Sequence, residues 1–148
     1  MSKVHVTNVL RLIQAADEIR ARLAGEFSAV HGLSVNEFVL MLHLENATTN
    51  RLSRVELARR MHISASTVTR MAQPLEKLGL LSRQTDDRDA RLAYVVLTKS
   101  GRRKVQEAGE TLSKQAQTVF QDRWDSSELQ QLAALLHRLV ADAPGNLT

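Results

Sequence analysis

The spacing of apolar residues predicts long helices at both ends of the chain. Near the N-terminus the apolar positions recur three and four apart, which predicts one helix over about residues 4–27 before a break at Gly32. Towards the C-terminus the same spacing predicts a helix over about residues 99–122 and another over about residues 125–140. Residues 141–148 lack the pattern and are expected to form a frayed tail.

The middle of the chain contains shorter helical stretches, each preceded by a serine that can cap a helix. Ser34, Ser53 and Ser64 can each accept a hydrogen bond from the backbone N–H three residues on. A glutamate stands at that third position after the first two serines, and such a residue can reach back to complete a capping box. A helix of about twelve residues is expected after Ser34. Two short helices are expected next, the second ending at Gly79, and together they predict a helix-turn-helix.

A hairpin is predicted directly after the second short helix. Residues 80–98 contain two β-prone runs that flank a charged segment rich in Asp. Residues 51–52 are expected to add a short strand to the same sheet. Arg83, Arg88 and Arg91 lie along or at the tip of this hairpin, where a guanidinium can enter a minor groove or bind a phosphate. A solvated loop with three arginines is the alternative interpretation.

The second short helix has an outward side that can hydrogen-bond to bases or phosphates in a major groove. No acidic residue precedes Glu76 on this helix. The alternative is the ordinary polar exterior of any surface helix. The candidate DNA-binding residues on this helix and its cap are Ser64, Ser66, Thr67, Thr69, Arg70 and Gln73.

Several short motifs follow one another in a fixed order through this middle region. They are Leu52-Ser53, Glu56-Leu57-Ala58, Ser66-Thr67-Val68-Thr69-Arg70, Leu75-Glu76-Lys77-Leu78-Gly79-Leu80, Arg83, Asp89-Ala90-Arg91 and Leu97-Thr98-Lys99-Ser100-Gly101. Together they resemble the winged-helix signature of the MarR family of bacterial transcription regulators. A match in order through the whole head is far more specific than a lone helix-turn-helix.

This resemblance implies a mainly α fold with a small β-hairpin wing, an α+β arrangement. A winged helix-turn-helix head is then flanked by long N- and C-terminal dimerisation helices. The chain is expected to be one domain over residues 1–148, with the head at about residues 34–104 and the dimerisation helices at residues 4–30 and 105–141. More apolar surface on the terminal helices than one chain can bury also favours an interface.

The resemblance also implies roles for residues of the wing. In the family an Asp braces an Arg that reaches the minor groove, and the matching positions here are Asp89 and Arg91. Ala90 stands between them where a basic residue is usual, so one wing charge is missing. Whether Arg88 compensates for it is an open question at this point.

The partners implied by the resemblance are double-stranded DNA and a second copy of the chain. A homodimer would bind a pseudo-palindromic operator and act as a repressor, released by a small anionic or aromatic effector. The sequence does not place the effector-binding residues. The alternative is a winged helix used as a protein–protein interaction module, whose helix and wing would carry apolar residues instead of basic ones.

The distribution of charge separates these two alternatives. Residues 51–104 contain 13 Lys and Arg against 5 Asp and Glu, a net charge of +8, whereas the rest of the chain has 7 against 11, a net charge of −4. Phosphate neutralisation requires positive charge on the same part that carries the groove-reading pattern. The charge pattern therefore favours DNA over a protein partner.

Other classes of protein are not supported by the sequence. No apolar run approaches the roughly 20 residues of a membrane span, and the N-terminus lacks an apolar signal segment, so we expect a cytoplasmic protein without membrane contact. The chain has no cysteine, its five histidines are far apart, and it has no Gly-rich phosphate loop or nucleophile elbow. We expect no enzymatic activity, no catalytic residue, no metal site and no cofactor.

Overall fold

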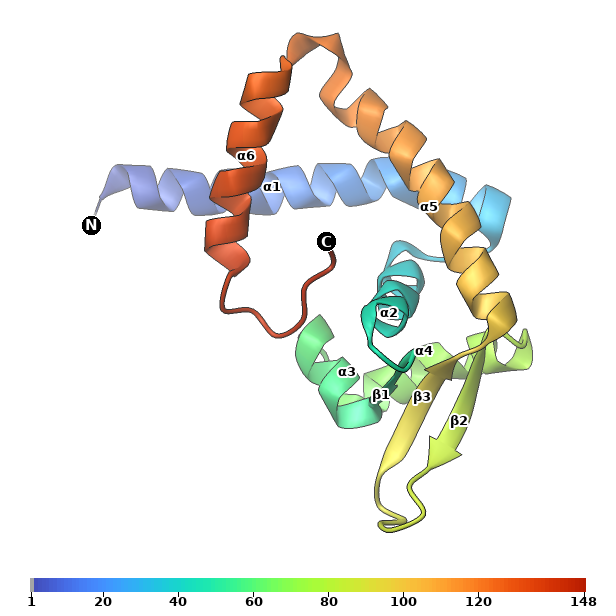
Figure 1. The fold of residues 1–148 in the computed structure, drawn as a ribbon. Coiled ribbons are helices and arrows are strands. Elements are labelled where there is room, and N and C mark those ends of the chain that lie inside the picture. Colours follow the sequence, from blue (N-terminus) through green and yellow to red (C-terminus); the bar gives the residue numbers. More distant parts are fainter. Residues whose placement is uncertain (1) are drawn as a thin grey trace.

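The computed structural model describes residues 2–148, which form a helical frame above a winged-helix head (Figure 1). A short π-helical turn, η1, extends the first helix, and a 3₁₀ turn, η2, joins the last two helices. The elements in chain order are α1 (Lys3–Glu26), η1 (Phe27–His31), α2 (Val35–Asn46), β1 (Arg51–Ser53), α3 (Arg54–Met61), α4 (Ala65–Lys77), β2 (Leu81–Thr85), β3 (Ala93–Leu97), α5 (Lys99–Phe120), η2 (Gln121–Arg123) and α6 (Ser126–Val140). The predicted mainly α fold with a small β wing is confirmed.

The capping residues set most helix boundaries where the sequence predicts them. The Ser34 hydroxyl accepts from the backbone N–H of Glu37 at 3.0 Å, and the Glu37 carboxylate accepts from the backbone N–H of Ser34 at 2.8 Å. Ser64 starts α4 in the same way, by accepting from the N–H three residues on. Gly79 follows the end of α4 with φ of +75°, a left-handed conformation that glycine adopts without steric cost.

The capping box predicted at Ser53 is only half formed, so that expectation was wrong in part. Ser53 accepts from the backbone N–H of Glu56 at 3.1 Å. The Glu56 carboxylate does not return to the Ser53 backbone, because it accepts hydrogen bonds from Arg59 and Arg60 one turn further on. Charge-assisted hydrogen bonds are stronger than neutral ones, which explains the choice of partner.

The sheet has the strand order β1-β3-β2, and all its pairings are antiparallel. β2 and β3 form the predicted hairpin, with Leu81 opposite Leu97 at its base and Thr85 opposite Ala93 near its tip. β1 supplies the expected short third strand, with Leu52 opposite Val95. The hairpin tip extends beyond the helices as a wing (Figure 1).

The core of the head is built around α2, which contacts α1, α3, α5 and the sheet. Its side chains Leu40, Met41 and Leu44 are fully buried. His43 is also buried, and its Nδ1 has no hydrogen-bond partner among the described residues. Burial and the positive charge of Arg60 lower the pKa of His43, so the imidazole is held in its neutral form.

The helices of the frame leave apolar side chains uncovered. Leu23 is the one buried residue of α1, and α6 has none. The large apolar residues exposed on these two helices include Val4, Val9, Leu10, Ile13, Leu135, Leu136, Leu139 and Val140. No single helix within residues 2–148 has the length and apolar content to cross a membrane, although the stretches 3–31 and 35–46, which meet at 78°, have them when taken together.

The C-terminal tail returns to the head, which corrects the expectation of a frayed end. The side-chain amide of Asn46 donates to the backbone carbonyls of Asn146 at 3.3 Å and Leu147 at 3.2 Å. Gly145, with φ of +76°, lies so close to the stem of Arg60 that an added Cβ would be 2.7 Å from its Cδ. Figure 1 shows the C-terminus between α6 and the head. Contacts between positions 100 residues apart carry no local signal in the sequence.

Candidate nucleic-acid interface

The candidate residues of α4 lie at its N-terminal end and along one exposed face. Ser66, Arg70 and Gln73 are exposed and Thr69 is half-buried, at positions three and four residues apart that share one side of a helix. The opposite side packs into the core through the buried residues Val68, Ala72 and Leu75. The structure therefore brings these four candidates together, with Ser64 and Thr67 at the start of the helix.

Several of these side chains are held by one another. The Ser64 Oγ lies 3.0 Å from the Ser66 Oγ and 2.8 Å from the Thr67 Oγ1. Arg70 donates from Nη2 to the Thr67 Oγ1 at 3.3 Å. The Thr69 hydroxyl donates to the Ala65 carbonyl at 3.1 Å. This network limits the rotamers of the exposed face, which reduces the entropy lost when such a surface binds a ligand.

The other two candidates, Arg88 and Arg91, lie in the turn of the β2–β3 hairpin. The Asp89 Oδ1 accepts from the backbone N–H of Arg91 at 3.0 Å, and the Arg91 Nε is 3.8 Å from the same oxygen. The Arg91 side chain remains 95% exposed, so Asp89 shapes the turn and holds the guanidinium only loosely.

A second aspartate, Asp86, organises the turn more extensively. Its Oδ1 accepts from the backbone N–H groups of Arg88 at 2.7 Å and Asp89 at 3.2 Å, and its Oδ2 accepts from the Tyr94 hydroxyl at 3.2 Å. These hydrogen bonds, with a smaller contribution from the Arg51 charge, lower the pKa of Asp86. Asp86 is therefore the residue that ties the wing tip to the sheet.

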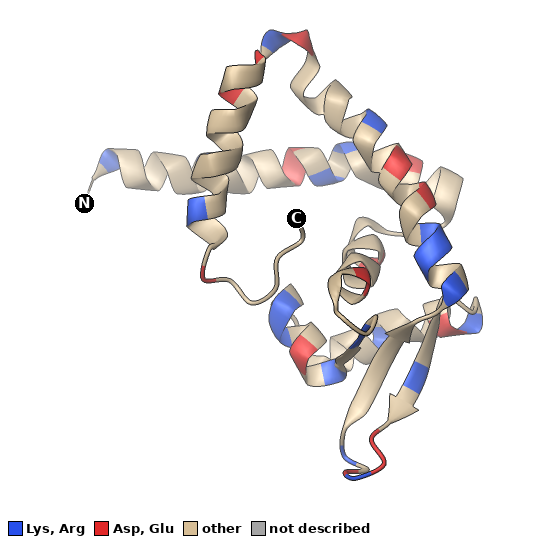
Figure 2. Ribbon diagram, viewed as in Figure 1, with Lys and Arg blue, Asp and Glu red and all other residues tan. Residues whose placement is uncertain are grey.

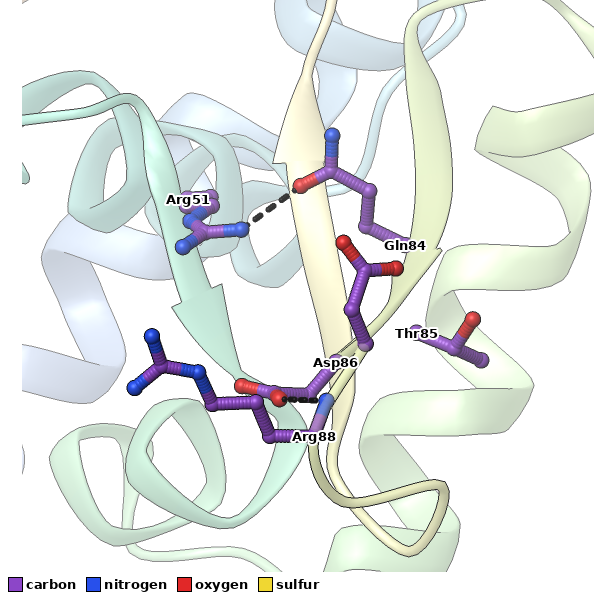
Figure 3. A pocket seen from close by; sticks show the side chains of 6 residues that line it. Arg51, Gln84, Thr85, Asp86 and Arg88 are labelled. Atoms are coloured by element: carbon purple, nitrogen blue, oxygen red, sulfur yellow. Dashed lines mark hydrogen bonds between the residues drawn. The ribbon is translucent and has the colours of Figure 1, made fainter.

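An open concavity of about 410 Å³ lies beside the wing (Figure 3). Its floor carries Arg51, whose guanidinium lies 4.3 Å from the centroid of the Tyr94 ring and donates to the Gln84 side chain at 2.8 Å. The Arg88 side chain extends along the same side of the hairpin, next to Asp86 (Figure 3). The concavity is polar and open, so it is suited to a charged, hydrated partner surface and not to an apolar ligand.

Charged residues of both signs lie on the head (Figure 2). Glu56 binds Arg59 and Arg60 at 3.0 Å each, and these contacts lower the pKa of Glu56 to about 2. Glu76 binds Arg83 at 2.9 Å and so joins the end of α4 to β2. Some arginines of the head are thus paired with a carboxylate, whereas Arg51, Arg54 and Arg70 donate to neutral groups.

One protein-family model matches the part of the chain that forms this arrangement. The model described as "MarR family" matches residues 33–92, from the start of α2 to the wing. This part of the chain, which holds the helix-turn-helix and the wing, is similar to the MarR family. The resemblance expected from the motifs is confirmed.

Individual curated proteins match parts of the chain. The repressor YetL of Bacillus subtilis is 31% identical over 81 residues, which make up 55% of this chain and 48% of YetL. The chain spans about half the length of the first curated relatives that it matches. These relatives are a transcriptional repressor and a transcriptional regulator.

Solved structures share the fold over most of the chain. A MarR family regulator of Streptomyces coelicolor, Sco3205, solved in complex with DNA, has a TM-score of 0.79 at 21% identity and covers 96% of this chain and 89% of its own. The structure of BpsR of Bordetella bronchiseptica, whose DNA binding is regulated by 6-hydroxynicotinic acid, has a TM-score of 0.75 at 24% identity and covers 91% of this chain and 98% of its own.

Sequence reasoning missed four residues of this candidate interface: Arg51, Arg54, Asp86 and Tyr94. Arg51 and Tyr94 meet only because β1 pairs with β3. Arg54, the first residue of α3, donates to the Thr69 hydroxyl of α4 at 3.1 Å. The one available signal was Asp86, because an Asp that follows a strand often accepts hydrogen bonds from the backbone of the next turn.

Proposed function

We propose that this chain is a sequence-specific regulator of transcription that binds double-stranded DNA as a homodimer. In this proposal α4 enters a major groove with the residues of its exposed face and cap, and the wing enters the adjacent minor groove with Arg88 and Arg91. The observation that carries the proposal is the exposed polar face of α4, free of acidic residues up to Glu76, within residues 51–104, whose net charge is +8.

The action of α4 is tested with Arg70→Ala. An Arg bound to a base edge contributes about 1–3 kcal/mol of discrimination, so the variant should lose preference at one position of each half-site. The matched control is Arg123→Ala, which removes an equal charge from the turn between α5 and α6, far from the head (Figure 1). Selection of duplexes from a random pool measures both. Unchanged preference in the first variant would contradict the role of α4.

The action of the wing is tested with Arg91→Ala. Because a side chain in a minor groove reads its width and charge, affinity should fall for every duplex, and most for those with A/T-rich flanks. Fluorescence anisotropy with labelled duplexes measures the loss. If affinity survives Arg91→Ala and is abolished by Arg88→Ala, then Arg88 takes the place that the family pattern gives to Arg91.

The dimer is supported by the apolar rows on α1 and α6, which the chain itself leaves uncovered. Leu139→Glu should yield a monomer in analytical ultracentrifugation, because a carboxylate in an apolar interface is strongly unfavourable. Leu78→Glu is the matched control, since Leu78 is 66% exposed and Leu139 is 65% exposed, but Leu78 lies at the end of α4. A dimer should also protect two half-sites centred about 10 base pairs apart or a multiple of that.

The sign of regulation and the effector complete the proposal. We take the chain to be a repressor released by a small anionic or aromatic molecule, supported by the repressor YetL and by the regulation of BpsR by 6-hydroxynicotinic acid. The test adds metabolite fractions to the preformed complex of protein and duplex. Release by one fraction, together with a rise in the thermal midpoint of the free protein, is the expected result. An activator would instead increase transcription from the bound promoter in vitro.

A further inference from the structure

A narrow groove of about 50 Å³ separates α4 from the sheet. It is lined by Thr69 and Glu76 of α4, by Arg83 and Tyr94 of the sheet, and by Arg54, the first residue of α3. In duplex DNA a major groove and the neighbouring minor groove are separated by one sugar-phosphate strand. A head that places α4 in the first and the wing in the second therefore faces that strand with this groove.

The two arginines of the groove differ in what holds them. The Arg83 Nε lies 3.0 and 2.9 Å from the two carboxylate oxygens of Glu76, which cancel its charge. Arg54 instead donates from Nη1 to the neutral Thr69 hydroxyl at 3.1 Å. A guanidinium has five N–H donors, so Arg54 keeps its full charge and four further donors for an anion.

The Thr69 hydroxyl makes its hydrogen bonds within the protein. Its single hydroxyl proton is donated to the Ala65 carbonyl, and the oxygen accepts from Arg54. A hydroxyl has only one proton to give, so Thr69 cannot donate to a base without breaking its bond to the helix backbone. Its position on α4 is suited to aiming Arg54.

The location of Arg54 gives no stability to α3 in the free protein. It is the first residue of that helix, where the helix dipole disfavours positive charge. Its hydrogen bond to Thr69 is exposed, and such contacts contribute little to stability. An anion bound to Arg54 would offset the unfavourable interaction of its charge with the helix dipole.

We propose that Arg54 binds the backbone phosphate that passes between the two grooves, and that Thr69 is its positioning residue and not a reader of bases. This inference rests on the proposed function, because it requires DNA on this face. It replaces a direct role of Thr69 with an indirect one. It also assigns a sequence-independent contact to a residue of α3.

The test compares Arg54→Gln with Arg59→Gln on a duplex that the wild-type protein selects from a random pool. Both variants remove one positive charge from α3, but Arg59 is paired with Glu56 at 3.0 Å. Loss of one phosphate contact reduces the slope of log affinity against log salt by about 0.9 per protomer. We expect this reduction for Arg54→Gln, together with weaker binding of all duplexes, and an unchanged slope for Arg59→Gln.

Thr69 is tested by Thr69→Val and Thr69→Ser. Thr69→Val should lower the affinity for all duplexes without changing base preference, and Thr69→Ser should bind like the wild type. In the Arg54→Gln background, Thr69→Val should cause no further loss of affinity. A change of base preference in Thr69→Val would overturn the positioning role. Equal slopes for Arg54→Gln and the wild type, or equal losses in the Arg54 and Arg59 variants, would overturn the phosphate contact.

Failure of the proposed function has a different signature from failure of this inference. A wild-type protein that binds no duplex, or binds with a flat salt dependence, contradicts DNA binding itself. A wild-type protein with a steep salt dependence that Arg54→Gln leaves unchanged contradicts only the Arg54 contact. Circular dichroism of each variant checks that the change lies in binding and not in folding.

Discussion

Replacing Gly101 with Ala should destabilise the junction between the wing and α5. Gly101 is buried in the first turn of α5, and its backbone N–H donates to the Thr98 hydroxyl at 3.0 Å. A Cβ at this position would be 2.1 Å from the Leu80 carbonyl oxygen and 2.6 Å from Leu97 Cδ1. Carbon atoms pack best at about 3.5–4.0 Å, so the backbone at the start of β2 has to move.

The magnitude follows from three contributions. Overpacking costs about 1–3 kcal/mol. The Leu80 carbonyl accepts from the N–H of Thr98 at 3.2 Å. The single proton of the Thr98 hydroxyl is shared between the Leu80 carbonyl at 3.0 Å and the Gly79 carbonyl at 2.7 Å, and weakening each of these two interactions of Thr98 costs about 1 kcal/mol. The higher helix propensity of Ala returns about 1 kcal/mol. We expect a net loss of about 2–4 kcal/mol in the free energy of unfolding.

Gly109→Ala provides the matched control in the same helix. A Cβ at Gly109 meets nothing within 4 Å, so the substitution should stabilise the protein by about 0.5–1 kcal/mol. Urea unfolding followed by circular dichroism, at one protein concentration for all variants, measures both changes. A Gly101→Ala variant as stable as the wild type would show that β2 and α5 are not locked at this junction.

Three further outcomes are expected. The unfolding free energy should decrease as pH falls from about 4.5 to about 2, because the pKa of Glu56 is lowered from 4.5 to about 2 and its protonation weakens the contacts with Arg59 and Arg60. Acid titration of Glu56→Gln should show a shallower decrease. The pKa of buried His43 is lowered from 6.5, so stability should also decrease as pH falls below about 6.5, and urea unfolding at two pH values should show no such step for His43→Leu. Asp86→Ala should weaken duplex binding more than Asp89→Ala in anisotropy assays, because Asp86 accepts three hydrogen bonds within the wing; the reverse order would assign the bracing to Asp89.

Features of the fold that depend on neighbouring positions were predictable from the sequence. The boundary of α2 follows from Ser34 and Glu37, and the end of α4 follows from Gly79, because capping and left-handed turns involve residues within one helical turn. The exposed face of α4 was likewise identified from its spacing. Local chemistry therefore determined the helices and the main candidate surface.

Features that depend on a choice between hydrogen-bond partners, or on contacts between separate elements, were not predictable from the sequence. The Glu56 carboxylate had two possible sets of donors, the Ser53 backbone and the arginines of α3. Only the three-dimensional arrangement shows that it accepts from the arginines. The contact of Arg54 with Thr69 requires the crossing angle of α3 and α4, which no periodicity encodes. Asp86 rather than Asp89 organises the wing because Tyr94 reaches it across the hairpin.

The return of the C-terminal tail to the head determines where a foreign segment can be attached without disturbance. A fluorescent protein or purification tag fused after Thr148 would begin next to Asn46 and would pull on the hydrogen bonds to Asn146 and Leu147. The same junction leaves little room at Gly145, where an added Cβ would meet the stem of Arg60. A label placed ahead of α1 begins at the opposite end of the frame (Figure 1) and leaves the docked tail intact.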